Sequence, residues 1–396
     1  MWIWHTETKY IRCISPLLSI EVVNIDGKLK VITCGTFKES ICSNAPTTLS
    51  QLLVALDKWL EAQSLTASGI IGYECKSLLN EKLDWVTDSN LIDQQIQGES
   101  VVFVMQAGNT EEICAKNSIS SIDSILTKDE KNNSLINNQT VVEVNKVVTH
   151  GLELRQKLDI DHLVVSVRFP VYINPDLLND LVNGVKTPIH QKFLIKSDNW
   201  NLISCTPEQF ISIADSKLQV QILAGTYQQG KDFDKTSLIN EHLSARNTLR
   251  SLVEDVVGKL ELIVDCDLLA FDKITHFHSA YEKPYHSDIS MLSTLAHLTP
   301  SPATGTQDKH TQFAIQQIES RPRGYYGGCF FLRTPGCLES LVSIRSIFKM
   351  ENSETGEMIV GAGLKKSSSL SSETVEIISK ATSTAKLLSV QLGNLQ

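Results

Sequence analysis

Short runs in which apolar and polar residues alternate occur along most of the chain and predict β-strands. In the clearest run, every second residue from Leu163 to Val171 is apolar, while Ser166 and Arg168 lie between them. Because side chains of a strand alternate between its two faces, we expect one face in a core and the other at a polar surface or site. Further strands are predicted at residues 20–25, 30–33, 101–106, 201–205, 209–214 and 217–223.

Apolar residues spaced three and four apart predict helices between these strands. The helices span residues 49–62, 142–158 and about 241–260, and in the last of them Leu249, Val253 and Leu260 share one face. Strands and helices are mixed without the strict alternation of a parallel sheet, which favours the α+β class.

One polar segment divides the chain. Residues 127–140 are rich in Lys, Asp, Glu and Asn, bury little, and are expected to form an exposed connection. The division predicts an N-terminal part, residues 1–130, and a larger part, residues 141–396.

Composition narrows the class of protein. With 396 residues, of which 42% are hydrophobic, the chain can bury one large core or two medium ones. The net charge of −9 argues against a nucleic-acid partner, which needs clustered Lys and Arg. Nine cysteines without a C-x-x-C pair indicate reduced, mostly buried residues. Neither a signal peptide nor a membrane-spanning run is visible, so we expect a cytoplasmic protein without a membrane partner.

The candidate chemistry is concentrated between residues 300 and 380. Four features follow one another there: a Pro/Gly loop at 300–305, Glu319 followed by Arg323-Gly324-Tyr325-Tyr326, the pair Ile344-Arg345, and Gly361-Ala362-Gly363 followed by Glu373, Glu376 and Lys380. The two glycines are expected to let the backbone approach a ligand and turn its N–H groups outward. On a helix, the two glutamates and the lysine share one face. The arrangement suits a small polyanionic substrate bound through a divalent metal ion.

This order of motifs resembles the chorismate-utilising enzymes: isochorismate synthase, salicylate synthase, the large subunit of anthranilate synthase, and aminodeoxychorismate synthase. Isochorismate synthases are the most similar, and the resemblance covers residues 150–390 strongly and the first 130 weakly. It implies two packed antiparallel β-sheets flanked by helices, with the N-terminal part in the same body and residues 127–140 as a surface loop. It also implies chorismate as substrate and Mg²⁺ as cofactor.

The resemblance implies two catalytic residues. Where isochorismate synthases carry a water-activating Lys, at residues 161–166, this chain has His162, and its Thr206-Pro207-Glu208 turn matches that of the acid that protonates the C4 hydroxyl. An imidazole can act as a general base near neutral pH. Alternatively, His162 is a surface histidine that replaced a lost catalytic residue, and Glu208 is a solvated turn residue.

Carboxylate binding is assigned in the same way. Arg345 offers a bidentate fork and, with Tyr326, would hold the enolpyruvyl carboxylate, whereas the backbone of Ala224-Gly225-Thr226 would meet the other carboxylate. Alternatively, Arg345 forms a surface salt bridge, and Gly225 belongs to an ordinary β-turn without a ligand. The implied substrate-binding residues are Gly225, Thr226, His276, Thr304, Tyr326, Arg345, Gly363 and Lys380.

Metal ligands should come from two helices. Glu376 and Glu373 lie on one, and counting back from His276 places the other ligand at Glu241, in a Glu-His pair at a helix start. This register leaves a short loop at residues 227–240 and puts Leu238 where the family has a carboxylate. The alternative for Glu241 is a glutamate favoured by the helix dipole.

The expected reaction is Mg²⁺-dependent addition of water to C2 of chorismate with loss of the C4 hydroxyl, giving isochorismate. A salicylate synthase, which goes on to eliminate pyruvate, would share these residues. A third possibility is a degenerate chorismate-binding relative without turnover. Anthranilate-type chemistry needs ammonia from a glutaminase, and no fused glutaminase is expected in this chain.

Overall fold

Two large β-sheets form the body of the protein. The computed structural model describes residues 1–5, 9–35, 45–86, 97–114, 136–173, 191–228, 235–271, 274–286, 288–305, 308–388 and 390–395. Within this part of the chain no helix is both long and apolar enough to cross a bilayer. Every pair of neighbouring strands described is antiparallel except β4 with β6.

The first sheet has nine strands. In spatial order they are β20 (Gln391–Leu392), β9 (Leu163–Tyr172), β19 (Thr355–Leu364), β18 (Ser346–Met350), β11 (Trp200–Thr206), β10 (Gln191–Lys196), β1 (Trp2–His5), β2 (Lys9–Cys13) and β8 (Glu111–Cys114). The N-terminal part of the chain therefore supplies one edge of this sheet, and the C-terminal part supplies the other.

The second sheet has eleven strands. Their order is β14 (Glu261–Phe271), β15 (Ile274–Pro284), β13 (Lys217–Gln228), β12 (Gln209–Ala214), β17 (Cys337–Val342), β16 (Cys329–Thr334), β5 (Thr66–Ile71), β7 (Val101–Gly108), β3 (Leu18–Ile25), β4 (Lys28–Gly35) and β6 (Leu83–Trp85). Strands from both predicted parts of the chain pair within each sheet.

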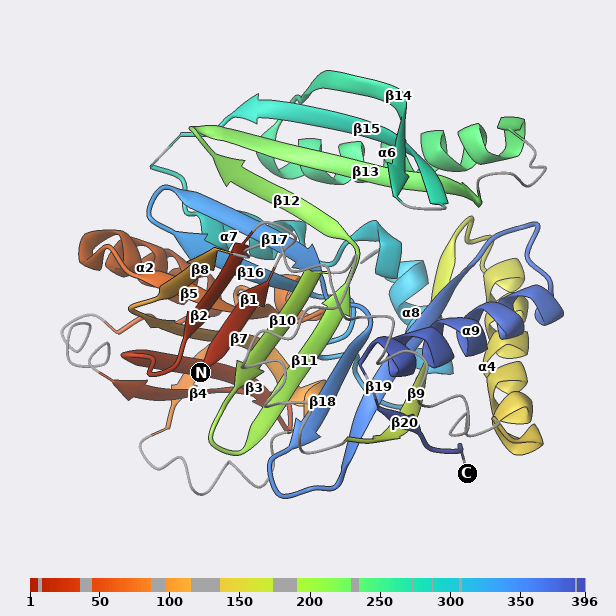
Figure 1. Ribbon diagram of the computed structural model, residues 1–396, viewed down its shortest axis with the longest axis horizontal. Helices are drawn as coiled ribbons and strands as arrows, with labels where there is room; N and C mark the ends of the chain where they lie inside the picture. Colours follow the sequence, from red (N-terminus) through yellow and green to blue (C-terminus); the bar gives the residue numbers. More distant parts are fainter. Residues whose placement is uncertain are drawn as a thin grey trace.

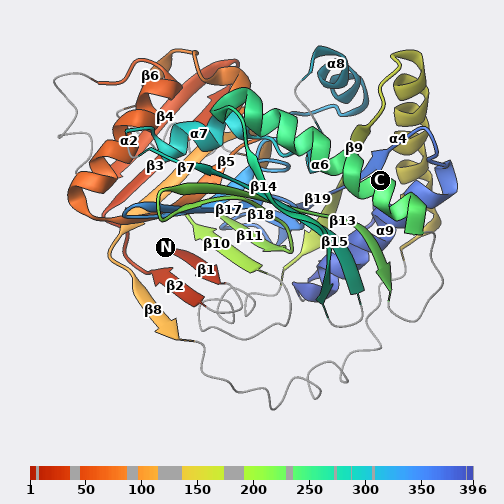
Figure 2. The same cartoon turned by 90° about the horizontal axis from the view of Figure 1, so that it is seen from above.

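Helices cover the outer faces of the sheets (Figures 1 and 2). The eleven-stranded sheet packs against α2 (Leu49–Gln63), α6 (Lys235–Val257) and α7 (Met291–Leu298), and the nine-stranded sheet against α4 (Asn138–Lys157), α8 (Lys309–Ile318) and α9 (Leu370–Leu387). Within the described residues, the 3₁₀ turns η1 (Cys75–Leu78), η4 (Gly98–Ser100) and η5 (Pro302–Thr304) lie in the connections.

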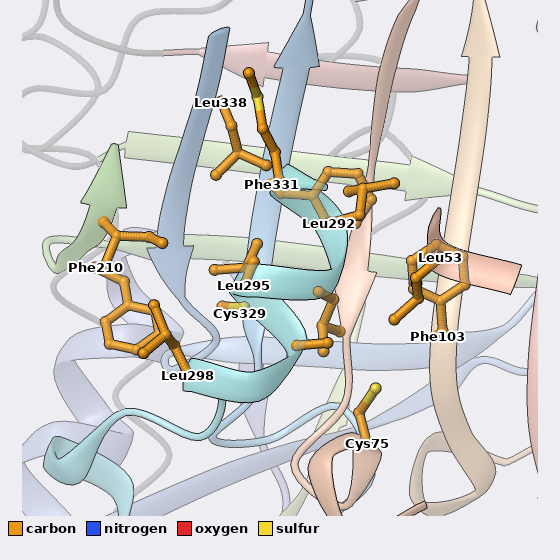
Figure 3. Packing of buried hydrophobic residues seen from close by; sticks show 14 of the residues in the cluster. Leu53, Cys75, Phe103, Phe210, Leu292, Leu295, Leu298, Cys329, Phe331 and Leu338 are labelled. Carbon is orange, nitrogen blue, oxygen red and sulfur yellow. The ribbon is translucent and has the colours of Figure 1, made fainter. Parts of the chain in front are cut away.

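Three apolar cores separate these layers. Between the sheets, Trp2, Trp4 and Trp200 are fully buried. Outside the eleven-stranded sheet, Leu292 and Leu295 of α7 pack against side chains of the strands beneath (Figure 3). The third core joins β9 and β19 to α4 and α9. Where a sheet is covered on both faces, its strands are apolar on both sides, and strict alternation is seen only in part of the chain.

The α+β class with two packed sheets flanked by helices is confirmed, as are most predicted elements. Some boundaries were wrong. Helix α6 begins at Lys235, so Glu241 lies in its second turn, and it ends at Val257, before Leu260. The predicted loop at 227–240 is mostly strand and helix, and its centre, residues 229–234, lies outside the described residues. Of the predicted connection at 127–140, residues 127–135 also lie outside, and helix α4 begins at Asn138.

Two further expectations about local structure were wrong. Gly361 and Gly363 do not form an N–H-presenting loop, because they belong to β19 and pair with Ser166 and Val164 of β9. His162 directly precedes β9 rather than lying within it. The glycines are needed for another reason, which the geometry of the site explains.

Candidate active site

Two of the connections that carry the chain from one sheet to the other bear a predicted site residue each. Between β11 and β12 stand Pro207 and Glu208, and between β17 and β18 stand residues 343–345, ending at Arg345. The connections are hydrogen-bonded neighbours. Val342 N–H donates to the Glu208 carbonyl at 2.9 Å, and Cys205 N–H donates to the Arg345 carbonyl at 3.2 Å. Glu208 and Arg345 are thereby held side by side at one end of the space between the sheets.

The backbone of Arg345 is unusual. Its φ of 52° lies in the left-handed region, which non-glycine residues adopt at a cost of about 1–3 kcal/mol. Such conformations persist where the surrounding structure fixes them, and here the carbonyl bond to Cys205 does so. Burial lowers the pKa of the guanidinium, while the nearby Cys205 and Glu208 oppose this shift. An Arg remains charged even so.

The pKa of Glu208 is strongly shifted. Burial raises the pKa of its carboxyl to about 7, even though the positive charges of Lys380 and Arg345 pull the pKa down. Three charged groups from three elements therefore lie within electrostatic reach of one another. A carboxylic acid with a pKa near neutrality can hold a proton and release it during a reaction.

The glycines of β19 make room for two predicted side chains. A Cβ at Gly363 would overlap Nε2 of His162, and a Cβ at Gly361 would overlap the hydroxyl of Tyr326. Residues two apart on a strand share a face and lie about 6.8 Å from each other. His162 and the Tyr326 hydroxyl therefore stand over the same face of β19, which is the face turned towards the other sheet.

Tyr326 connects this face to Glu208. It is buried, and burial raises the pKa of its phenol, with the nearby Glu208 adding to the rise. Its turn is joined to the second crossover, because Gly327 N–H donates to the Ser343 carbonyl at 2.8 Å. The structure thus brings together the five predicted residues His162, Glu208, Tyr326, Arg345 and Gly363.

Helix α9 closes the site with Lys380. Its ammonium donates to the Gly361 carbonyl at 3.1 Å and forms an ion pair with Glu376 at 2.6 Å. Glu373, one turn earlier, is buried and accepts from the Ser372 hydroxyl at 3.4 Å. The predicted helical face of two carboxylates and one cation is therefore present.

The donor set can be compared with the needs of a metal ion. Among the residues that the structure describes, no group of three or more His, Cys, Asp or Glu side chains is placed to hold one. Glu373 and Glu376 are two carboxylates on one helix face, and the side chain of Glu241 lies outside the described residues. Two carboxylates with substrate oxygens and water suit Mg²⁺, so the chemistry of the donors fits that ion.

The other predicted residues lie on β13, β15 and η5. Gly225 has φ 67° at a bulge in β13, and a Cβ there would overlap the Leu238 carbonyl of α6. Thr226 is paired in register with His276, whose pKa is lowered by burial. The side chain of Thr226 lies outside the described residues. In both views the ends of β13 and β15 approach the layer of β9, β19 and α9 (Figures 1 and 2).

Thr304 supports the site through its loop. Its buried hydroxyl lies 3.0 Å from the carbonyls of both Ser301 and Gly327, so the side chain is bonded to the backbone. Its own carbonyl accepts from Arg323. Thr304 therefore joins η5 to the turn that carries Tyr326.

Sequence reasoning missed two residues of this region. Glu74 accepts from the N–H groups of Arg323 and Gly324, at 2.8 and 3.0 Å, and burial raises its pKa to about 7. The ring of Tyr73 lies 4.8 Å from the guanidinium of Arg323. Both follow β5 in the N-terminal part, and no strand was predicted at residues 66–71, so the sequence reasoning had no element from which to place them.

Comparison with known proteins identifies the family. A model of the chorismate binding enzymes matches residues 28–386, which is most of the chain. The protein belongs to this family. An anthranilate synthase component 1 from Lactococcus lactis is 21% identical over 76% of this chain and 68% of its own length. Further curated anthranilate synthase components match over about half of their own length.

Solved structures of chorismate binding enzymes share the fold. A protein described as a 2,3-dihydroxybenzoate-specific isochorismate synthase from Bacillus anthracis is 15% identical, with a TM-score of 0.64 over 98% of this chain and 95% of that one. An anthranilate synthase component I from Streptococcus pneumoniae is 14% identical, with a TM-score of 0.65 over 96% and 92%. At these identities the likeness concerns the fold alone.

Proposed function

We propose that this chorismate binding enzyme converts chorismate to isochorismate, as an isochorismate synthase. The observation that carries the proposal is Glu208, whose pKa is raised to about 7 by burial beside Lys380 and Arg345. Departure of a hydroxide from C4 is difficult unless an acid protonates it, and a carboxyl that keeps its proton near neutral pH meets that need.

The reaction would use two proton transfers. His162 would take a proton from water as the water oxygen bonds to C2, and Glu208 would give a proton to the departing C4 oxygen, so that one water enters and one leaves. The imidazole stands over the β19 face that also carries the Tyr326 hydroxyl, whose pKa responds to Glu208. This placement supports the proposal that base and acid border one space.

Cationic groups would anchor the substrate. Chorismate carries two carboxylates, and Arg345 with Tyr326 would hold that of the enolpyruvyl group by a bidentate bond. The ring carboxylate would lie towards α9, near Lys380 and the backbone around Gly225. We place the remaining contacts of the substrate at Thr226, His276, Thr304 and Gly363.

We propose Mg²⁺ as the cofactor, held by Glu241, Glu373 and Glu376. When bound, the ion would neutralise the substrate carboxylate and orient the ring. Lys380 forms an ion pair with Glu376 at 2.6 Å, so this carboxylate already has a cation beside it. Neutralising the substrate carboxylate and orienting the ring are roles that suit a hard cation with oxygen ligands.

Two other reactions share the scaffold. A salicylate synthase would form the same intermediate and then eliminate pyruvate. An anthranilate synthase would use ammonia in place of water, and the curated relatives named anthranilate synthase component 1 favour this second candidate. A non-catalytic chorismate-binding relative is the remaining alternative.

One incubation separates these outcomes. Chorismate and Mg²⁺ are added to the protein, with and without an ammonium salt, and products are identified by chromatography and mass. Isochorismate supports the proposal, while salicylate with pyruvate, or anthranilate in the ammonium arm, supports the respective alternative. Chorismate binding by calorimetry without any product would support the non-catalytic alternative. Glu208→Gln, which keeps a similar shape but cannot act as the acid, is the control and should form no isochorismate.

A further inference from the structure

We propose that the buried Glu319–Arg323 ion pair is a positioning device for His162, because it replaces a neighbouring strand at the open edge of β9. The role of His162 as base rests on the proposed function, whereas the capping of β9 rests on geometry alone. Neither Glu319 nor Arg323 needs to touch the substrate for this role.

The first observation is that β9 has an uncovered edge. On one side it pairs with β19 along its whole length. On the other side, among the described strands, β20 pairs with it only at Val171 and Tyr172. The half of β9 that follows His162 therefore presents backbone N–H and C=O groups that no described strand satisfies, and buried groups of this kind need partners.

The ion pair supplies those partners. Ser166 N–H donates to Oε1 of Glu319 at 3.1 Å, and Nη2 of Arg323 donates to the Val164 carbonyl at 2.7 Å. Residues two apart on a strand point their backbone groups to the same edge, so the carboxylate and the guanidinium bind adjacent groups on one edge. The carboxylate of Glu319 is the acceptor and the guanidinium of Arg323 is the donor that a neighbouring strand would otherwise provide.

The pair is rigid enough to fix a position. Arg323 is 1% exposed, and its Nε donates to Oε2 of Glu319 at 2.9 Å. Its Nη1 donates to the Thr304 carbonyl, and its guanidinium lies between the rings of Tyr73 and Tyr326, at 4.8 and 5.8 Å from their centroids. The planar fork thus reaches β9, η5 and the Tyr326 turn at once, which a Lys could not do.

His162 is the residue that depends on this edge. It stands directly before β9, with its imidazole over Gly363 of β19. The position of His162 is set by β9, because Arg323 binds the carbonyl of Val164, two residues after His162. A shift of about 1 Å in a reacting group can cost about a hundredfold in rate.

The test compares two pairs of variants. Glu319→Ala removes the acceptor for Ser166, whereas Glu319→Gln keeps an acceptor oxygen in the same place. We expect Glu319→Ala to lower kcat about 10–100-fold while the KM for chorismate changes less than threefold, and to speed hydrogen exchange in peptides covering residues 163–168. Glu319→Gln should recover most of both. Arg323→Lys should behave like Glu319→Ala, because an ammonium cannot bind Val164, Thr304 and Glu319 together.

The matched control is a second buried Arg–carboxylate pair, Arg333 with Asp57, which are 3% and 5% exposed and lie between β16 and α2. Asp57→Ala and Asp57→Asn should lower the melting temperature, with kcat unchanged in the folded protein at a temperature below the transition. Equal losses of kcat in both sets of variants, or unchanged exchange in residues 163–168 of Glu319→Ala, would overturn the proposal. If the wild type has no turnover, the proposed function fails, but the exchange measurement still decides whether the ion pair caps β9.

Discussion

Among the regions of the molecule in which a carboxyl group lies near an arginine, two use this arrangement differently. Beside α2, Arg333 binds Asp57 at 2.8 Å and Glu61 at 2.6 Å, and hydrogen bonding to Arg333 lowers the pKa of Glu61. At the crossovers, Arg345 and Lys380 lie near Glu208, yet burial raises the pKa of Glu208 to about 7.

The opposite pKa shifts of Glu61 and Glu208 reflect different surroundings. Asp57 also accepts from the Ser290 hydroxyl at 2.8 Å and from Leu292 N–H at 3.0 Å, so its charge fixes the start of α7. There the charges satisfy one another and hold α2, α7 and β16 together. At the crossovers, the neighbouring cations do not offset the burial of Glu208. Acids with raised pKa values are frequent at reaction sites, so this contrast supports the proposed role of Glu208 as the acid.

The largest effect is expected from Glu376, whose ion pair with Lys380 is as short as that of Glu61 with Arg333, each at 2.6 Å. Glu376→Gln should abolish Mg²⁺-dependent turnover, because a metal ion contributes several kcal/mol to a transition state, about a thousandfold or more. Product formation at saturating chorismate and increasing Mg²⁺ measures this.

The matched control is Glu61→Gln, which weakens an ion pair of the same length far from the site. It should keep full turnover with a small loss of stability. Wild-type activity that persists in excess chelator would contradict the assignment of Mg²⁺, and similar losses in both variants would remove the contrast between the two regions.

The next effect concerns His162. His162→Ala should lower kcat about 10²–10⁴-fold, the usual contribution of a positioned base. The wild-type rate should fall as the pH falls through an imidazole-like pKa, because protonation removes the acceptor lone pair. His162→Lys should restore or raise the activity, since a lysine stands at this position in the isochorismate synthases that the sequence resembles. An unimpaired His162→Ala variant would mean that another group activates the water.

Gly363→Ala tests the same residue without removing it. The added methyl would overlap Nε2 of His162 and push the imidazole from its place over β19. We expect kcat to fall with little change in KM. The control is Val164→Ala, at the residue that pairs with Gly363. This change removes side-chain atoms instead of adding them.

The sequence could predict the fold, the order of motifs and the glutamates and lysine of α9. These follow from patterns within single elements, such as the spacing of Glu373, Glu376 and Lys380 on a helix. The purpose of Gly361 and Gly363 could not be predicted, since it depends on which side chains of distant segments, Tyr326 and His162, stand over β19. Local composition suggests a loop for a Gly-Ala-Gly run, whereas pairing with β9 makes it a strand.

The start of α6 was missed for a related reason. A strong apolar pattern begins only near Leu249, so the earlier turns from Lys235 carry a weak signal. The roles of Glu319 and Arg323 were also beyond sequence reasoning, because the edge that they cap belongs to a strand about 150 residues away.

Arg345 should show an intermediate effect. Arg345→Ala should weaken chorismate binding by about 2–4 kcal/mol, the range for removing one partner of a buried, hydrogen-bonded charge pair. Titration calorimetry with the inactive Glu208→Gln background avoids turnover during the measurement. Arg333→Ala, the corresponding change in the structural region, should leave the affinity of the folded protein unaltered. An affinity equal to that of the parent would show that Arg345 is not the clamp.

The smallest effect, on stability, tests the protonation of Glu208 directly. Its pKa is about 7 in the folded protein and about 4.5 when unfolded, so the folded state binds the proton more tightly. Folding is therefore favoured below pH 4.5, and this contribution is lost as the pH rises through 7, by at most about 1.4 kcal/mol per pH unit. Glu208→Gln, which carries no such proton, should be more stable relative to wild type at pH 8 than at pH 5.5, by about 2 kcal/mol in denaturant titrations. Glu61→Gln is the control: the pKa of Glu61 is lowered on folding, so its stabilisation is present at both pH values, and the stability of this variant relative to wild type should be the same at pH 5.5 and pH 8. If the relative stability of Glu208→Gln is the same at both pH values, Glu208 is ionised in the folded protein and cannot serve as the acid.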